Sequence, residues 1–129
     1  PRSLDANAYF WKLVGEIAKV LETDSDSKYE ELLYDYGSFA NIPIWKPELE
    51  NEKKKYRLCV ETGETVLTDK NGSEQTFVWC KCYRGSSEYN TSEMARLIDG
   101  VVFEAKQLGI DTRTPKEIEA LKNAWQAEN

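Results

Sequence analysis

Histidine is absent from the 129 residues of this chain, and its absence excludes several classes of chemistry. Without an imidazole there is no Ser-His-Asp triad, no Cys-His nucleophile, no HNH-type nuclease site and no His-ligated zinc. Cysteine is also scarce, with three residues at Cys59, Cys80 and Cys82. Because a Cys-x-Cys pair lacks the spacing of a zinc site, we interpret the cysteines as reduced thiols in the core rather than as metal ligands.

Long apolar runs and a basic charge are missing as well. No run approaches the length of a membrane-spanning helix and no signal peptide is evident, so we expect a cytoplasmic protein without a membrane partner. The chain begins with Pro1, so we expect upstream residues to be absent from it. A formal charge of −6 argues against a general nucleic-acid binder and favours a protein partner. Length and composition predict one domain over residues 1–129.

Apolar residues recur at intervals of three and four in both terminal regions, which predicts helices there. The first is expected from Leu4 to about Glu22, and Gly37 is expected to end the second in a left-handed conformation. The third helix contains Gly100. Glycine inside a helix is less favourable than Ala by about 1 kcal/mol, so we expect Gly100 to be there because another element packs closely against it. The expected N-caps of the four helices are Ser3, Thr23, Thr91 and Thr114.

The middle of the chain changes to a period of two, which is typical of strands. Residues 42–47 are expected to be extended, strands are expected at 56–60, 65–67 and 75–83, and Asn71-Gly72 is a hairpin-turn signal. The last strand is apolar on both faces, so we expect both to be covered or one to lie at a subunit interface. The fold class is therefore α+β, with two N-terminal helices, a small antiparallel β-meander and two C-terminal helices.

Three segments together resemble one family. Arg2-Ser3-Leu4-Asp5-x-Asn7, followed by aromatic residues, resembles the signature of the phage NinB (Orf) recombination proteins. The segment from Tyr83 to Met94, followed by Leu97-Ile98-Asp99-Gly100, is similar to small NinB-like prophage proteins of Gram-positive bacteria, as are 108–112, Thr114-Pro115 and Trp125. The resemblance implies a homodimer that binds single-stranded or tailed DNA, acts with single-stranded-DNA-binding protein and helps to load a recombinase, without catalysis or a cofactor.

Candidate DNA-binding residues come from three places in the chain. At the start of the first helix, a phosphate can meet Arg2 and the free amides near Ser3, with Asn7 orienting a base. The alternative is structural, with Asp5 and Asn7 bonded to the loop at 85–87. The Gly- and Ser-rich segment with Arg84, Ser86 and Ser87 either exposes amides and hydroxyls to phosphate or is only a polar connection, and it lacks P-loop spacing.

The third place is the single basic concentration, residues 53–57 together with Lys81 and Arg84. Lys55, Arg57 and Lys81 are expected on one surface of the sheet, if the strands pair as predicted. Lysines interleaved with aromatics such as Trp79 suit single-stranded nucleic acid, because phosphates and bases are then both contacted. The alternative is a solvated hairpin edge, where Lys prevents aggregation.

Two other functions stay open. The acidic surface with exposed aromatics suits a protein-interaction module that docks a replication or host-defence protein. A histidine-free metal nuclease would need acids such as Asp5, Glu88 and Asp99 to converge, and no spacing in the sequence forces this. We assign no catalytic and no metal-binding residue.

Overall fold

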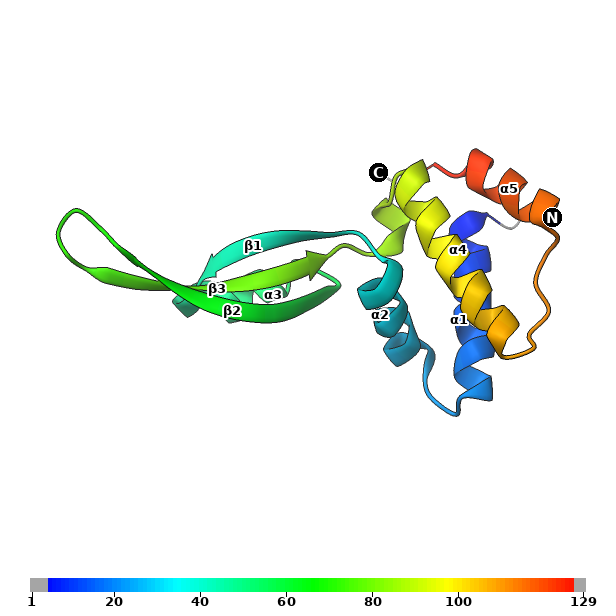
Figure 1. The fold of residues 1–129 in the computed structure, drawn as a ribbon, viewed down its shortest axis with the longest axis horizontal. Helices are drawn as coiled ribbons and strands as arrows, with labels where there is room; N and C mark the ends of the chain where they lie inside the picture. The colour runs from blue at the N-terminus through cyan, green and yellow to red at the C-terminus, as the bar shows by residue number, and fades with distance from the viewer. Residues whose placement is uncertain (1–4, 127–129) are drawn as a thin grey trace. The chain divides into compact units, whose positions relative to one another are not determined.

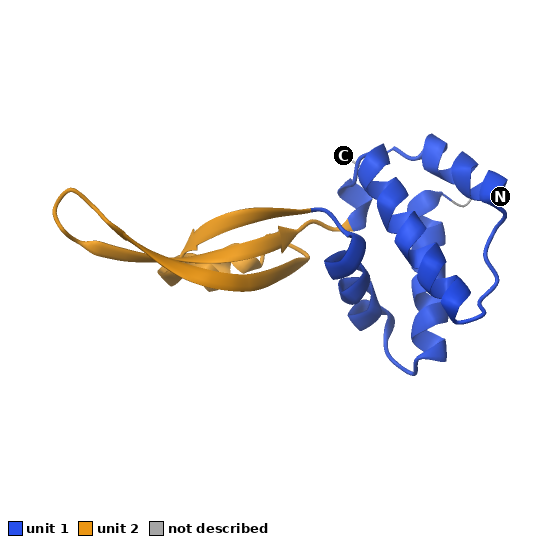
Figure 2. Cartoon of the chain, viewed as in Figure 1, with its two compact units in different colours: residues 1–38, 86–129 blue, residues 39–85 orange. Residues whose placement is uncertain are grey.

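A computed structural model describes residues 5–126, which form two compact units (Figure 2). The helical unit comprises the described parts of 1–38 and 86–129, and the sheet unit comprises 39–85. The α+β class is confirmed, because antiparallel strands and helices occupy separate stretches of the chain.

The helical unit contains α1 (Ala6–Val20), α2 (Ser25–Tyr36), the 3₁₀ turn η2 (Ser86–Glu88), α4 (Thr91–Gln107) and α5 (Pro115–Ala124) (Figure 1). Helix α1 packs against α2 and α4, and α4 also contacts α2 and α5. Most of each predicted apolar stripe is buried in α1, α2 and α4, whereas α5 buries Ile118, and burial of each large side chain contributes about 1.5–3 kcal/mol. The fully buried residues include Phe10, Leu13, Ile17, Leu32, Leu97, Ile98 and Val101.

The first two helices begin with different caps from those predicted. Asp5 caps α1, and its carboxylate accepts the N–H of Ala8 at 2.7 Å. The predicted cap, Ser3, lies outside the described residues. Asp24 rather than Thr23 caps α2, because the aspartate reaches the N–H of the third helical residue. Asp is a stronger N-cap than Thr, so the adjacent aspartate takes the position.

Of the last two helices, α4 begins with a different cap from the one predicted and α5 begins with the predicted cap. Asn90 rather than Thr91 caps α4 and forms a capping box with Glu93. Thr114 caps α5 as predicted, with Glu117 as its capping-box partner. In both helices the capping box satisfies backbone N–H groups that have no partner within the helix.

At two positions of the helical unit, Gly37 and Gly100, neighbouring atoms leave no room for a Cβ, and this lack of room rather than the backbone conformation explains the glycine. A Cβ built on Gly100 would lie 2.3 Å from the ring of Tyr36, which confirms the expected close packing. Gly37 follows α2 with φ −80°, so the expected left-handed conformation is wrong. A Cβ at Gly37 would meet the carbonyl oxygen of Leu33 at 2.5 Å, and only glycine fits there.

The sheet unit contains three antiparallel strands, β1 (Phe39–Trp45), β2 (Leu58–Thr68) and β3 (Glu74–Tyr83), in the order β1-β3-β2. Strands β2 and β3 form a hairpin, and β1 pairs with the other edge of β3, so this order differs from the sequential order of a simple meander. The turn at Asn71-Gly72 is confirmed, since Gly72 has φ +80°.

Two features of the sheet unit differ from the prediction. Strand β2 is one continuous strand where two were expected, with a register shift between Glu61 and Gly63. The 3₁₀ turn η1 (Lys46–Glu48) begins within residues 42–47, which were expected to be extended throughout, and the short helix α3 (Leu49–Lys53) that follows was not predicted. Figure 1 shows α3 behind the sheet, so the sheet unit has its own helical cover.

Candidate functional site

The sheet has two different faces, because successive side chains of a strand point to opposite sides. The face under η1 and α3, which we term the covered face, contains a small core built on Ile44, Val78, Cys80 and Cys82. Leu49 of α3 packs against this core, together with Ile42, Tyr56 and Cys59. This packing fixes which side of each strand remains for contact with a ligand.

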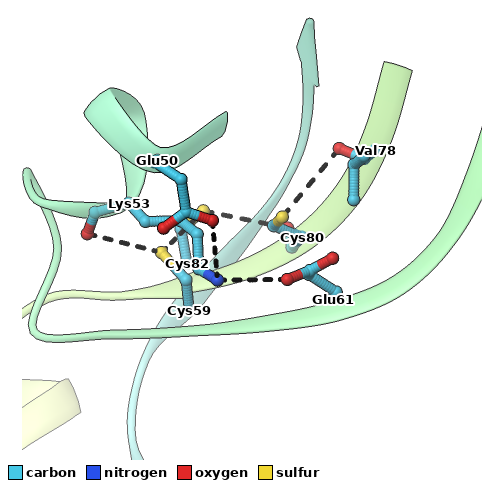
Figure 3. Close-up of polar contacts among 7 residues, drawn as sticks. All are labelled: Glu50, Lys53, Cys59, Glu61, Val78, Cys80 and Cys82. Atoms are coloured by element: carbon cyan, nitrogen blue, oxygen red, sulfur yellow. Dashed lines mark hydrogen bonds and ion pairs between the residues drawn. The ribbon is translucent and has the colours of Figure 1, made fainter. Parts of the chain in front are cut away.

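The acidic residues of the strands lie on the covered face. Glu61 and Glu64 are the register partners of Cys80 and Val78. Figure 3 shows Lys53 between Glu61, at 3.0 Å, and Glu50, at 3.9 Å. Lys46 binds Glu64 at 2.9 Å in the same way. These glutamates therefore have lysine partners on the helix-bearing side of the sheet.

The three cysteines belong to this covered face. The Sγ atoms of Cys59 and Cys82 lie 3.8 Å apart, and all three cysteines are free thiols (Figure 3). Burial, followed by the hydrogen bond with Cys59, raises the pKa of Cys82 to about 12, and burial also raises the pKa of Cys80. These two thiols therefore stay protonated at neutral pH, and their role is packing rather than nucleophilic chemistry.

The opposite face, which we term the open face, is rich in aromatics and contains no carboxylate. Its exposed rings are Phe39, Trp45 and Trp79, at 45%, 43% and 39% exposure. Gly63 is the register partner of Trp79, so the β2 residue directly opposite this indole has no side chain. The register places on the open face Phe39, Asn41, Pro43, Trp45, Leu58, Val60, Gly63, Thr65, Leu67, Gln75, Phe77, Trp79, Lys81 and Tyr83.

Basic residues gather at one end of the sheet. The Lys81 ammonium lies 4.3 Å from the centroid of the Phe39 ring, a cation–π contact. Arg57 donates its backbone N–H to the carbonyl oxygen of Tyr83 at 3.0 Å. Because Arg57 precedes β2 and Arg84 follows β3 at the paired ends of these strands, both arginines lie at the end that holds Lys81.

The predicted basic surface therefore forms only in part. Arg57, Lys81 and Arg84 belong to the same end of the sheet, and the register places Lys81 on the open face. Lys55 instead binds Glu52 of α3 at 2.8 Å, and Lys53 binds Glu61. Two lysines of the basic run, Lys53 and Lys55, are thus engaged by nearby glutamates. Sequence reasoning missed Phe39 and Trp45, whose signal was the alternation on either side of Pro43.

Charge is divided unequally between the two units. Residues 39–85 contain eight Lys and Arg and seven Asp and Glu, a formal charge of +1. The remaining sequence contains nine Lys and Arg and sixteen Asp and Glu, a formal charge of −7. The acidity that argued against nucleic acid thus belongs to the helical unit, and the sheet unit does not share it.

Asn7 and Ser86 lie inside the helical unit. The Ser86 hydroxyl donates to Asn7 Oδ1 at 2.7 Å and accepts from the Tyr29 hydroxyl at 3.1 Å. The Ser86 N–H donates to the Tyr29 oxygen at 2.8 Å, and Ser86 is buried. This network is the structural alternative considered for Asn7, so we leave Asn7 and Ser86 out of the candidate surface. Ser87 is half-buried.

The remaining candidates do not form a catalytic centre in the part of the chain described. Arg2 and Ser3 lie outside it. Asp5 is engaged as a helix cap, and Asp99 binds Lys122 at 2.5 Å. Among residues 5–126, no group of three or more His, Cys, Asp or Glu side chains is placed to hold a metal ion. The described helices are too short or too polar to cross a membrane.

Comparisons with protein-family models, with curated proteins and with solved structures find no match to this chain. The resemblance to NinB proteins therefore stays a prediction that rests on the residues at the two ends of the sequence. The function has to be argued from the open face itself.

Proposed function

We propose that this protein binds single-stranded DNA along the open face of its sheet. Bases stack on Phe39, Trp79 and Trp45, and phosphates are held by the basic end at Arg57, Lys81 and Arg84. The observation that carries the proposal is the segregation of side chains: the open face combines exposed aromatic rings with no carboxylate, whereas Glu61 and Glu64 lie on the other face. Stacking of this kind is worth about 1–3 kcal/mol per base and tolerates any sequence.

The dimensions of the face suit a few nucleotides. Phe39 pairs with Tyr83 at the basic end, and Trp45 pairs with Phe77 at the other end. At about 3.3 Å per residue, the six steps from Tyr83 to Phe77 span roughly 20 Å. Other sheets that bind single strands stack about two or three bases on their aromatics. Three exposed rings over this length provide a comparable platform.

The biological role in the proposal follows the resemblance stated above. The protein would act as a phage recombination accessory, a homodimer that binds single-stranded or tailed DNA and cooperates with single-stranded-DNA-binding protein. A strand bound on an open face stays accessible from its other side, which suits exchange with a second protein. Loading of recombinase on DNA coated with single-stranded-DNA-binding protein, with and without this protein, tests that role.

The test of the DNA-binding proposal is fluorescence anisotropy with a labelled single strand at low salt. Trp79→Leu keeps an apolar side chain but removes the stacking surface, and we expect affinity to fall about tenfold, which is about 1.4 kcal/mol. Phe103→Leu is the matched control, because Phe103 is 59% exposed on α4 in the acidic helical unit. An equal effect of the two substitutions would contradict the proposal.

A charge-matched pair of variants tests the phosphate contacts separately. Lys81→Gln removes a positive charge from the open face, and Lys12→Gln removes one from the exposed side of α1. Both change the net charge equally, so a difference between them reports position. We expect Lys81→Gln alone to weaken binding by several-fold and to reduce its salt dependence.

A second candidate function is supported by the helical unit. Its formal charge of −7, with Tyr34 and Phe103 exposed, suits docking of a basic protein that acts in replication or host defence. A stable complex with such a protein, together with no DNA binding at low salt, would favour this candidate over the first.

A further inference from the structure

Asn41 lies on the open face within β1, although asparagine is depleted from β-strands. The adjacent Ile42, and Ile44 beyond it, pack in the core of the covered face, so alternation places Asn41 on the other side with Phe39. Asn41 is exposed, and among residues 5–126 its amide has no hydrogen-bond partner. Neither packing nor strand propensity therefore explains an asparagine at this position.

The residue directly across from Asn41 is Lys81 of β3. Lys81 stands between Cys80 and Cys82, which both belong to the covered core, so its side chain is on the open face as well. The Lys81 ammonium lies 4.3 Å from the centroid of the Phe39 ring. Because directly opposed residues of antiparallel strands have Cβ atoms about 4.5–5.5 Å apart, the ammonium and the amide of Asn41 can reach the same base.

The charge of Lys81 favours one orientation of the Asn41 amide. Side-chain amide dipoles orient in the local field, and the oxygen carries the negative end of this dipole. The oxygen of Asn41 is therefore favoured on the side of the ammonium, and the amide nitrogen on the side away from it. Across the two side chains this gives a donor at Lys81, an acceptor at Asn41 Oδ1 and a donor at Asn41 Nδ2, in that order.

We propose that Asn41 and Lys81 together select thymine among the bases that stack on the open face. In a single strand the Watson–Crick edge of a stacked base is free to be read by side chains. The thymine edge presents an acceptor, the N3–H donor and a second acceptor, so it complements all three protein groups. The inference rests on the proposed function and adds a base preference to it.

The other bases fit this arrangement less well. Cytosine has an amino donor where thymine has O4, and its N3 is an acceptor, so two of the three protein groups face a like group. Adenine and guanine each complement only two of the three groups. Removing the amide of Asn41 should therefore remove the preference for thymine while the stacking rings and the phosphate contacts remain.

The test compares an oligothymidine with an oligocytidine of equal length by fluorescence anisotropy, because a homopolymer presents the same base at every register. We expect the wild-type protein to prefer the oligothymidine by about tenfold, a discrimination typical of one good base contact. Asn41→Leu should abolish this preference, since leucine neither donates nor accepts. Gln75→Leu is the matched control, because it removes an exposed amide from the open face at the end away from Lys81. Circular dichroism checks that each variant is folded.

A modified strand tests the hydrogen bond from the side of the DNA. Oligothymidine methylated at N3 keeps its rings and phosphates but has no N3–H to donate. The wild-type protein should bind the methylated strand as weakly as the oligocytidine. Asn41→Leu should bind the methylated and unmethylated strands equally.

The outcomes separate the two proposals. If neither oligonucleotide binds at low salt, both the DNA-binding function and the base preference are overturned. If both bind equally, and Trp79→Leu weakens both, the open face is retained and the base preference is overturned. If Gln75→Leu removes the preference as fully as Asn41→Leu, the assignment to Asn41 is overturned.

Discussion

The substitution Gly100→Ala tests the packing of the helical unit through two opposed effects. In a helix interior, alanine is favoured over glycine by about 1 kcal/mol. Here the new Cβ would lie 2.3, 2.4 and 2.6 Å from three ring atoms of Tyr36, close to the stem of that side chain. Such overpacking costs about 1–3 kcal/mol, and contacts this short belong at the upper end. We therefore expect a net destabilisation of about 1–2 kcal/mol.

Gly15→Ala provides the matched control in the same unit. Gly15 lies inside α1, and a Cβ there would meet only the Ser25 hydroxyl at 3.8 Å, an ordinary contact. The helix preference then acts alone and should stabilise the protein by about 0.5–1 kcal/mol. Thermal and urea unfolding followed by circular dichroism should give opposite shifts for the two variants. A Gly100→Ala protein as stable as Gly15→Ala would refute the packing of Tyr36 on Gly100.

Three further predictions concern single side chains. Ser86→Ala should cost about 1–3 kcal/mol in urea unfolding, because it leaves buried partners at Asn7 and Tyr29, while affinity for single-stranded DNA should stay unchanged. Since burial raises the pKa of Cys82 from 9.0 to about 12, the folded state retains this proton longer, and stability should fall as pH rises from 9 to 12. Cys82→Ala should flatten that alkaline fall. Hydrogen bonds from Ser27 lower the pKa of Asp24, so its contribution to stability should be lost as pH falls below 3.8, and Asp24→Asn should reduce this loss.

Local signals predicted the four helices of the helical unit, and at α2 and α4 they missed the cap by one residue. Thr114, Pro115 and Glu117 lie in one turn and each favours the same helix start, which the structure confirms. At the start of α4, Asn90 and Thr91 are both good N-cap residues, and the sequence alone does not show which of the two adjacent residues caps the helix. The helix α3 has five residues, too few for a period of 3.6 to be visible.

The candidate site was harder to predict because it depends on strand register. Phe39 and Trp45 belong to a strand that contains Pro43, and their shared face with Trp79 follows only from the pairing of β1 with β3. The register shift between Glu61 and Gly63 interrupts the alternation of side chains between the two faces of β2, so the sequence does not show a single strand there. The bond between Asn7 and Ser86 joins residues 79 apart in sequence, so the sequence offered it only as one alternative.

The overall charge is a misleading guide to this protein because its two units differ. A chain of net charge −6 contains a sheet unit of +1, and the strands of that unit place Glu61 and Glu64 on the face opposite Phe39 and Trp79. A bound DNA strand contacts the charges and aromatic rings of one surface, so the local arrangement matters more for binding than the net charge of the chain. At physiological salt the acidic helical unit is screened beyond about 8 Å.

The measurement that tests the central claim most directly is the salt dependence of binding to a single strand and to its duplex. With three basic residues, Arg57, Lys81 and Arg84, at one end of the sheet, the account predicts a slope of log K against log salt of about −2 for the single strand. It also predicts much weaker binding of the duplex, whose bases are not free to stack on the rings. No binding of the single strand at low salt, or equal affinity for the duplex, would contradict the account.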